Sequence, residues 1–120
     1  ATGRAQGTVA GFVMFCGVIV PGEVHPPHRH TSVAINYYTA GSGWSIADGE
    51  RHEWEAGDLQ LTPAWAAHGH ANQADGTVWG YTLQDTALLY HLGALLWQEE
   101  LGGATAQLGV EDAPASGGGR

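Results

Sequence analysis

The chain has no lysine, and its only basic residues are four arginines, against twelve aspartates and glutamates. Its formal net charge at pH 7 is −8. Nucleic acids and anionic lipid surfaces are bound through clustered positive charge, which this composition does not supply. The balance of charges therefore argues against nucleic acid and membranes as partners.

The chain is also poor in cysteine, since Cys16 is the single one. One cysteine cannot form an internal disulfide, so we expect a reducing, cytoplasmic location. No apolar run is long enough to cross a bilayer, and no signal peptide is visible. With 120 residues and 43% apolar content, the chain is expected to form one domain with a modest core.

Short stretches rich in β-branched and aromatic residues recur between turns that contain glycine or proline, which predicts strands. The expected strands are residues 8–20, 28–39, 44–47, 51–55, 59–62 and 77–83. The dipeptide Asp48-Gly49 between two of them is typical of a two-residue hairpin turn. Strands this short and this regularly spaced predict an all-β sandwich or barrel.

The pattern changes after Asp85, where leucines recur at nearly helical spacing as far as residue 101. We expect one C-terminal α-helix over residues 86–101, with Asp85 capping its first turn and Gly102-Gly103 ending it. Residues 1–103 would then form the barrel plus the helix. Residues 104–120 would form a tail rich in glycine, alanine and serine.

The most informative segment holds two histidines, His28 and His30, just after a proline-rich turn. In an extended chain, residues two apart point to the same face, so both imidazoles can bind one ion. A third histidine, His68, lies at another junction of a turn and a strand, and Asn72 follows it four positions later. Together the two blocks predict a metal site built on strands.

These blocks resemble the two motifs of the cupin superfamily. The first motif is matched by Gly22, His28 and His30. Its glutamate is missing, because Ala34 and Ile35 occupy the two possible positions. The second motif is matched by Gly57, Pro63, His68 and Asn72. The resemblance implies the cupin double-stranded β-helix, a jelly-roll-like barrel.

Within the superfamily, the sequences around the motifs look like those of gentisate and salicylate 1,2-dioxygenases. The similar phrases are Pro-Gly-Glu-Val at 21–24, Asp-Gly-Glu-Arg at 48–51 and Thr-Pro-Ala-Trp at 62–65. In that family too the motif glutamate is missing, and three histidines hold Fe(II). Its members are bicupins, and this single-domain chain resembles one of their halves. By analogy with many small cupins, we expect a homodimer formed by strand exchange or helix packing.

The resemblance implies that the metal ligands are His28, His30 and His68. Iron is the metal that it implies, although three imidazoles alone would also suit zinc, nickel, manganese or cobalt. Neutral ligands leave the ion its full positive charge, which favours a small substrate that chelates it through two oxygen atoms.

Two further residues are candidates for catalysis. Continuing the inward alternation of the two histidines along their strand places Asn36 and Tyr38 on the inner face. Asn36 stands where the dioxygenases carry an arginine, so an uncharged carbonyl, hydroxyl or amide is favoured over a carboxylate. His70 shares a face with His68 and could be a fourth ligand, a hydrogen-bonding support for the ligands or a proton shuttle.

Besides Asn36, the candidates for substrate binding are Tyr38, Gln60 and Trp65. The expected function is that of a non-haem Fe(II) dioxygenase, which acts with dioxygen on a hydroxylated aromatic or similar chelating small molecule. One alternative is an isomerase, cyclase or lyase that uses the ion as a Lewis acid. Another is a cupin that binds a small ligand without catalysis.

Overall fold

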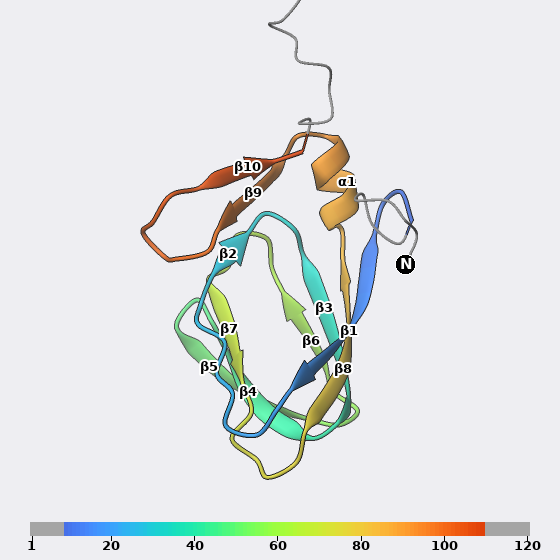
Figure 1. Ribbon diagram of the computed structural model, residues 1–120, viewed down its shortest axis with the longest axis vertical. Coiled ribbons are helices and arrows are strands. Elements are labelled where there is room, and N and C mark those ends of the chain that lie inside the picture. Colours follow the sequence, from blue (N-terminus) through green and yellow to red (C-terminus); the bar gives the residue numbers. More distant parts are fainter. Residues whose placement is uncertain (1–8, 110–120) are drawn as a thin grey trace, which may run out of the picture.

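The computed structural model describes residues 9–109, which form ten strands and one short helix (Figure 1). The elements are β1 (Val13–Ile19), β2 (Arg29–His30), β3 (Ala34–Ala40), β4 (Ser42–Ala47), β5 (Glu50–Glu55), β6 (Leu59–Thr62), β7 (His68–Ala71), β8 (Val78–Gln84), α1 (Thr86–His91), β9 (Leu95–Gln98) and β10 (Ala106–Leu108).

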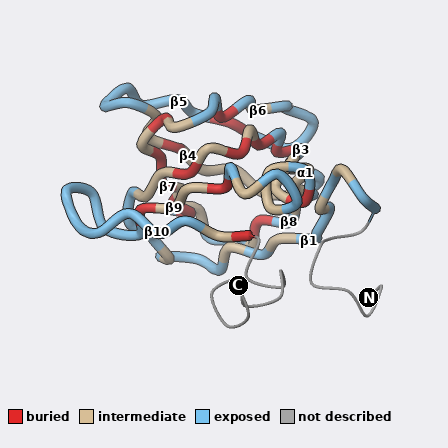
Figure 2. The backbone as a smooth tube through the Cα atoms, turned by 90° about the horizontal axis from the view of Figure 1, so that it is seen from above, coloured by how far each residue is buried: buried red, intermediate tan, exposed pale blue. Residues whose placement is uncertain are grey.

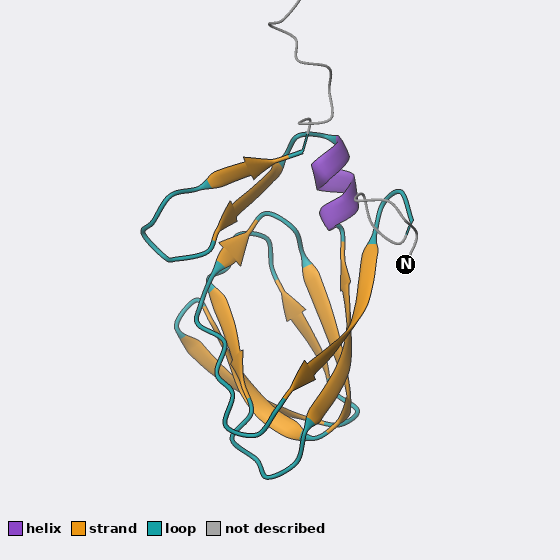
Figure 3. Cartoon of the chain, viewed as in Figure 1, coloured by secondary structure: helices purple, strands orange, loops and turns teal. Residues whose placement is uncertain are grey.

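The strands pair in three antiparallel sheets, with the orders β1-β8-β3-β6, β5-β4-β7 and β10-β9-β2. Figure 1 shows the first two sheets on opposite sides of a barrel, and β9, β10 and α1 gathered at one end of it. Figure 3 shows how far strands predominate over the single short helix of the described chain. The all-β fold expected from the sequence is confirmed.

Strand β3 shows why the barrel has a polar interior. Ala34, Asn36 and Tyr38 are buried, whereas Ile35 and Tyr37 between them are exposed. This is the alternation of a strand with one face toward the interior, in the parity expected from the sequence. The buried polar residues are found mostly on the inner faces, where they can serve a site.

An aromatic pair fills the end of the barrel away from α1. Tyr38 and Trp54 stack in parallel, with ring centroids 3.7 Å apart and planes 7° apart. Val78 is buried with them, and Ile19 packs against this cluster. Figure 2 shows the buried parts of the strands in red in the inner part of the molecule, and long exposed stretches in pale blue on β5, β6 and β10. The apolar core is thus small, and it leaves the rest of the interior for a cavity.

The hairpin predicted at Asp48-Gly49 is confirmed. Strands β4 and β5 pair with the register Ala47↔Glu50, which leaves two residues in the turn. Asp48 has a φ of 48° and Gly49 a φ of 84°. Positive φ at both central residues is the geometry of a type I′ turn, whose twist matches that of the strands.

The C-terminal helix is much shorter than expected. Helix α1 ends at His91, and Gly93 follows with a φ of 68°. From Leu95 the chain is extended as β9, which pairs with β2 on one side and β10 on the other. The expectation of a helix over residues 86–101 is therefore wrong beyond residue 91, because pairing with β2 outweighs the helical spacing of the leucines.

Asp85 does not cap this helix, because its side chain makes no capping hydrogen bond. Its Oδ1 instead accepts a hydrogen bond of 2.8 Å from the backbone N–H of Val33. The expected cap is thus replaced by a long-range contact. The carboxylate ties the start of α1 to the turn between β2 and β3, beside the candidate site.

Ordered structure extends beyond residue 103, where the sequence led us to expect a tail. Strand β10 lies within residues 104–120 and pairs with β9. The rest of that expected tail, from residue 110, lies outside the described residues. The helix of the described chain is too short to cross a membrane.

Candidate metal centre

The candidate centre lies where the segment before β2 pairs antiparallel with β7. The backbones of His28 and His68 exchange two hydrogen bonds, of 2.9 and 2.8 Å, and the backbone N–H of His25 donates to the carbonyl of His70 at 2.7 Å. Gly69 allows this contact, because a Cβ there would lie 2.5 Å from the carbonyl oxygen of His25. The two sequence blocks are therefore joined directly through the backbone.

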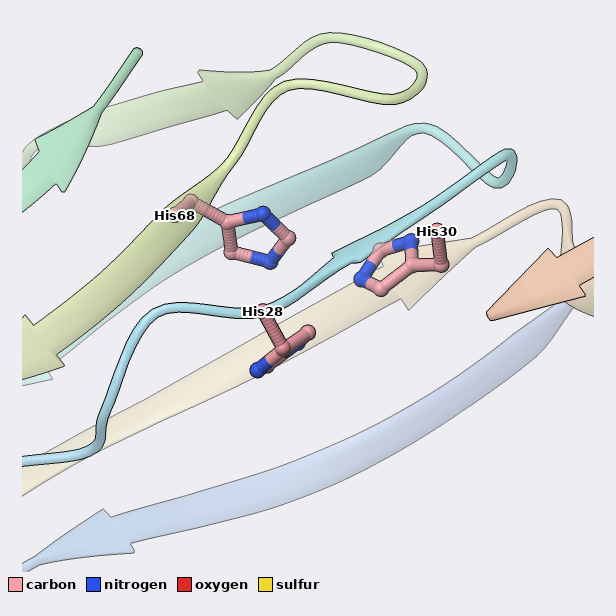
Figure 4. A group of neighbouring side chains, drawn as sticks. All are labelled: His28, His30 and His68. Atoms are coloured by element: carbon pink, nitrogen blue, oxygen red, sulfur yellow. The ribbon is translucent and has the colours of Figure 1, made fainter. Parts of the chain in front are cut away.

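The three predicted ligands converge beside this pair of segments (Figure 4). Each of His28, His30 and His68 offers one ring nitrogen, and these three atoms lie within 4.8 Å of one another. The ring centroids are 4.5 to 5.3 Å apart. His30 and His68 are buried, and His28 is half-buried. This arrangement is compact enough for one ion to be shared by all three imidazoles.

Hydrogen bonds orient two of these rings. The Nδ1 of His30 lies 2.9 Å from the carbonyl oxygen of Ser32, and the Nδ1 of His68 lies 2.8 Å from that of Ala66. A carbonyl oxygen can only accept, so each Nδ1 carries the proton and donates it. The lone pair is then left on Nε2, which is the protonation state that a metal ligand needs.

Burial keeps these histidines neutral. It lowers the pKa of His30 to about 4, and it also lowers the pKa values of His28 and His68. A positive charge on His68 would also lower the pKa values of His28 and His30, because like charges this close repel. At neutral pH a metal ion would therefore meet three unprotonated imidazoles and displace no proton.

Within residues 9–109, no carboxylate joins the three imidazoles. At the positions of the cupin motif glutamate, Ala34 faces the interior with a methyl group, and Ile35 is exposed on the outer face. A set of three neutral nitrogen ligands suits divalent first-row metals such as iron, zinc or cobalt, and it leaves coordination positions for a guest. The residues present thus fit the metal that the sequence implied.

An indole that the sequence analysis missed covers two of the ligands. Trp97 of β9 stacks on His28, with centroids 5.2 Å apart and planes 13° apart, and on His30 at 4.6 Å and 24°. Its Nε1 donates a hydrogen bond of 2.7 Å to Oε2 of Glu99. The segment was expected to be helical, and the glycine at position 93 is the signal that could have placed it on a strand instead.

The imidazoles open into a cavity of about 240 Å³ inside the barrel. Its lining is largely apolar and includes Phe15, Ile19 and Val78. Within the described part of the chain, no arginine lines it. The guest that this space favours is therefore a small, mostly apolar molecule, without a cationic side chain to pair with a carboxylate.

Asn36 lines this cavity as predicted, and its partner is a residue that the sequence analysis missed. Thr82 of β8 lies opposite Asn36 in the register of the sheet, and its Oγ1 donates a 2.7 Å hydrogen bond to the Asn36 Oδ1. With the oxygen engaged, the amide N–H groups are what Asn36 offers to a guest. Alternation along β8, where Val78, Gly80 and Thr82 face inward, is the signal that could have found the threonine.

His70 also lines the cavity, beside His68, with ring centroids 5.8 Å apart. Its Nδ1 lies 2.7 Å from the Ser45 hydroxyl, and that hydroxyl donates to Oε1 of Gln60 at 2.9 Å. Since the serine proton is used on the glutamine, Nδ1 of His70 donates to the serine oxygen and its Nε2 keeps the lone pair. Burial, reinforced by His68, lowers the pKa of His70 to about 4.

Of the other predicted site residues, Tyr38 lines the cavity, and Gln60 and Trp65 lie outside its lining. Tyr38 lines the cavity, and its hydroxyl donates a 2.8 Å hydrogen bond to Gln60. Gln60 itself does not line the cavity, and its amide oxygen instead holds Tyr38 and Ser45 in place. Trp65 does not line it either, since its ring lies under the guanidinium of Arg29 at 5.1 Å.

The fold and this three-histidine site define a small metal-binding β-barrel. Residues 17–79, just over half of the chain, match the cupin domain family. The chain belongs to this family, as the two motifs predicted.

Comparisons with individual proteins narrow the resemblance. The chain is 34% identical to a 5-nitrosalicylic acid 1,2-dioxygenase of Bradyrhizobium sp. over 82% of this chain and 48% of that protein. It is 44% identical to gentisate 1,2 dioxygenase 1 of Aquipseudomonas alcaligenes over 48% of this chain and 17% of that protein. The chain thus spans at most about half the length of these relatives.

A solved structure supports the fold. The crystal structure of a salicylate 1,2-dioxygenase from Pseudaminobacter salicylatoxidans matches with a TM-score of 0.77 and 24% identity. The match covers 82% of this chain and 28% of that one. At this identity the likeness concerns the architecture alone, which is that of one cupin barrel within a longer protein.

Proposed function

We propose that this cupin carries the metal centre of a non-haem Fe(II) dioxygenase that acts on a hydroxylated aromatic or a similar chelating small molecule. The observation that carries the proposal is the convergence of three neutral imidazoles, without a carboxylate, on one cavity. The relatives support this reaction class, since they are named 1,2-dioxygenases of 5-nitrosalicylic acid and of gentisate.

His28, His30 and His68 would hold the iron, with His30 and His68 binding through Nε2. Bound iron would supply the redox chemistry through which both atoms of dioxygen enter the substrate, so that no external reductant is needed. The apolar part of the cavity wall, with Phe15 and Ile19, would exclude water and favour a flat aromatic ring.

Asn36 and His70 would act on the substrate itself. The amide N–H groups of Asn36, held by Thr82, would donate to an uncharged oxygen of the substrate. His70 is neutral at pH 7, and its Nε2 would accept a hydrogen bond from a substrate hydroxyl and orient that group in the cavity. Its bond to Ser45 would keep the ring in the orientation that this hydrogen bond requires.

Dioxygen uptake by the full chain, loaded anaerobically with Fe(II), tests this function. Salicylate, its amide, catechol and gentisate are suitable first substrates, and we expect uptake of one dioxygen per molecule converted. His68→Ala should lose most of the bound iron and the uptake while its circular dichroism stays unchanged. The matched control is His91→Ala, since His91 is an exposed histidine of α1.

Three results would contradict the proposal. Turnover that proceeds equally well without dioxygen would point to Lewis-acid chemistry of an isomerase, cyclase or lyase. Retention of an aromatic guest with no turnover under any condition would point to a binding protein. Unchanged iron content in His68→Ala would show that the ligands are assigned wrongly.

We also propose that the chain forms a homodimer, and that it does so through the outer side of the sheet β1-β8-β3-β6. The register of this sheet brings together seven apolar side chains, here called the outer apolar face: Val18, Ile35, Tyr37, Leu59, Leu61, Trp79 and Tyr81. They are between 41% and 70% exposed. A monomer in water rarely leaves so large a continuous apolar surface uncovered.

Charge and area favour a second copy of the chain as the occupant. Two chains with a net charge of −8 repel each other least when they meet through a face that carries no charge, and the outer apolar face carries none. Side chains of this size at these exposed fractions amount to roughly 800 Å² per chain, about what one partner of a standard interface buries.

The location is a further proposal. Cys16 of β1 is a free thiol, and the sequence has no second cysteine to which it could bridge within the chain. A chain without an internal disulfide is typical of a reducing compartment, which supports a cytoplasmic location.

A further inference from the structure

The C-terminal hairpin contacts the metal ligands through one side chain. In the pairing of β2 with β9, Trp97 lies directly opposite His30. Its indole stacks on the rings of both His30 and His28, so one aromatic plane covers two of the three ligands. The alignment is closest with His28, where the planes differ by 13°. This contact brings a segment near the C-terminus to the centre of the site.

A stacking partner matters because an imidazole is otherwise free to turn. Rotation of a histidine ring about its last side-chain bond has broad minima, so the direction of Nε2 is set by what the ring touches. His30 and His68 are held through Nδ1 by backbone carbonyls. His28 is the most exposed of the three; the backbone of Pro26 is its hydrogen-bonding neighbour, and the broad face of Trp97 adds a restraint on the plane of its ring.

The indole is itself held in place from the next turn. Its Nε1 donates a 2.7 Å hydrogen bond to the Glu99 carboxylate. The Glu99 charge is also felt at the site: burial lowers the pKa of His28, and Glu99 partly opposes that lowering. The hydrogen bond to Glu99 therefore fixes the rotation of the indole that stacks on His28 and His30.

The strand that carries Trp97 is firmly attached to the ligand strand. The Thr31 backbone N–H donates to the Leu96 carbonyl at 3.0 Å, and the Leu96 N–H donates to the Thr31 hydroxyl at 2.9 Å. Nε of Arg29 donates to Oε1 of Gln98 at 2.8 Å. The hairpin is thus clamped at the residues that flank His30.

From this geometry we infer that Trp97 and Glu99 are positioning residues of the metal centre, which keep the imidazoles of His28 and His30 aimed at one point. The inference rests on the proposed metal site and adds to it residues outside both cupin motifs. It concerns ring orientation, so its readout is the binding and the spectrum of a metal probe rather than turnover.

Titration of the full, metal-free chain with Co(II) tests the inference, because the visible absorption of bound cobalt reports its coordination geometry. Trp97→Leu should weaken binding by about tenfold or more and alter the spectrum, as changes to residues supporting a ligand do. Trp97→Phe keeps an aromatic plane, so its cobalt affinity and its spectrum should stay close to those of the wild type. Glu99→Gln should give a smaller, few-fold loss, whereas Glu100→Gln, which changes the exposed neighbour, should bind as the wild type does.

Wild-type affinity and an unchanged spectrum in Trp97→Leu, when the wild-type chain binds cobalt, would overturn the inference. If Trp97→Leu fails to fold by circular dichroism, Glu99→Gln and Glu100→Gln decide instead, and equal affinities of these two would overturn it. Failure of the wild-type chain to bind cobalt or iron would overturn the proposed metal site, which is a different result.

Discussion

At the scale of single residues, the cavity offers neutral hydrogen-bond donors and no fixed positive charge. Asn36 is buried on β3, and its amide oxygen is engaged by Thr82. A neutral N–H donor satisfies a carbonyl or an amide but does not offset the cost of burying a carboxylate's charge, whereas a guanidinium pairs with that charge. The side chain at position 36 should therefore decide which substituent of the ring is recognised.

The substitution Asn36→Arg should shift the preference of the cavity toward carboxylated aromatics. We expect the ratio of affinities for salicylate over its amide to rise about tenfold, since a charge-assisted pair is stronger than a neutral one by roughly 1–2 kcal/mol. Asn36→Leu serves as control and should weaken binding of both compounds. Binding is measured by calorimetry, and an unchanged ratio in Asn36→Arg would mean that position 36 does not contact the guest.

At the scale of elements, the metal site depends on how closely two backbone segments approach. Gly69 lies between His68 and His70 on β7, and it is buried against the turn at Pro26-Pro27. A Cβ at this position would lie 2.5 Å from the His25 carbonyl oxygen, too close for any real contact. The glycine thus lets the histidines of both motifs share one site.

We expect Gly69→Ala to push the turn away from β7 and to separate His28 from His68. Cobalt affinity should fall at least tenfold, and the free energy of unfolding should fall by about 1–3 kcal/mol, as in other overpacked interiors. Gly76→Ala is the matched control, because nothing lies within 4 Å of its Cβ. Cobalt titration and thermal unfolding measure both effects, and equal values for the two variants would contradict this account.

Element prediction from the sequence succeeded where the cause is local. The Asp48-Gly49 turn and the alternation along β3 depend on neighbouring residues alone, and both agree with the structure. The segment after residue 91 was predicted wrongly, because its conformation depends on pairing with β2, far away in the chain. The leucine spacing near Leu95 fits a helix equally well, and only that distant partner decides between the two.

At the scale of the whole molecule, the outer apolar face leads to a test of assembly. Leu61→Glu places a charge on this face, twice in a symmetric dimer, and should convert the dimer to monomers. Leu92→Glu changes an equally exposed leucine at the end of α1 and should leave the dimer intact. Sedimentation equilibrium measures both.

Two outcomes would contradict this assembly. A monomeric wild-type chain would remove the homodimer altogether. Dissociation by Leu92→Glu but not by Leu61→Glu would favour the helix packing expected from the sequence over the sheet face.

The sequence predicted that His28, His30, His68 and Asn36 would face one interior, because motif spacing and strand parity are local properties, and the structure brings these four residues to one cavity. It did not reveal Trp97 or Thr82, because each reaches the site through the register of strands that are distant in sequence. The place of Gln60 behind the cavity wall likewise follows from packing against Tyr38. Residues that support a site are thus harder to predict than residues that form it.

The antiparallel pairing of the two histidine segments has a consequence for the stability of the protein. An ion held by His28 and His68 would cross-link two distant parts of the chain, much as a disulfide does, in a protein whose lone thiol cannot form one. Such a cross-link reduces the freedom of the unfolded chain, and an ion that binds the native form alone adds stability in proportion to its own binding. Removal of the metal would then shorten the lifetime of the folded protein as well as abolish the proposed reaction.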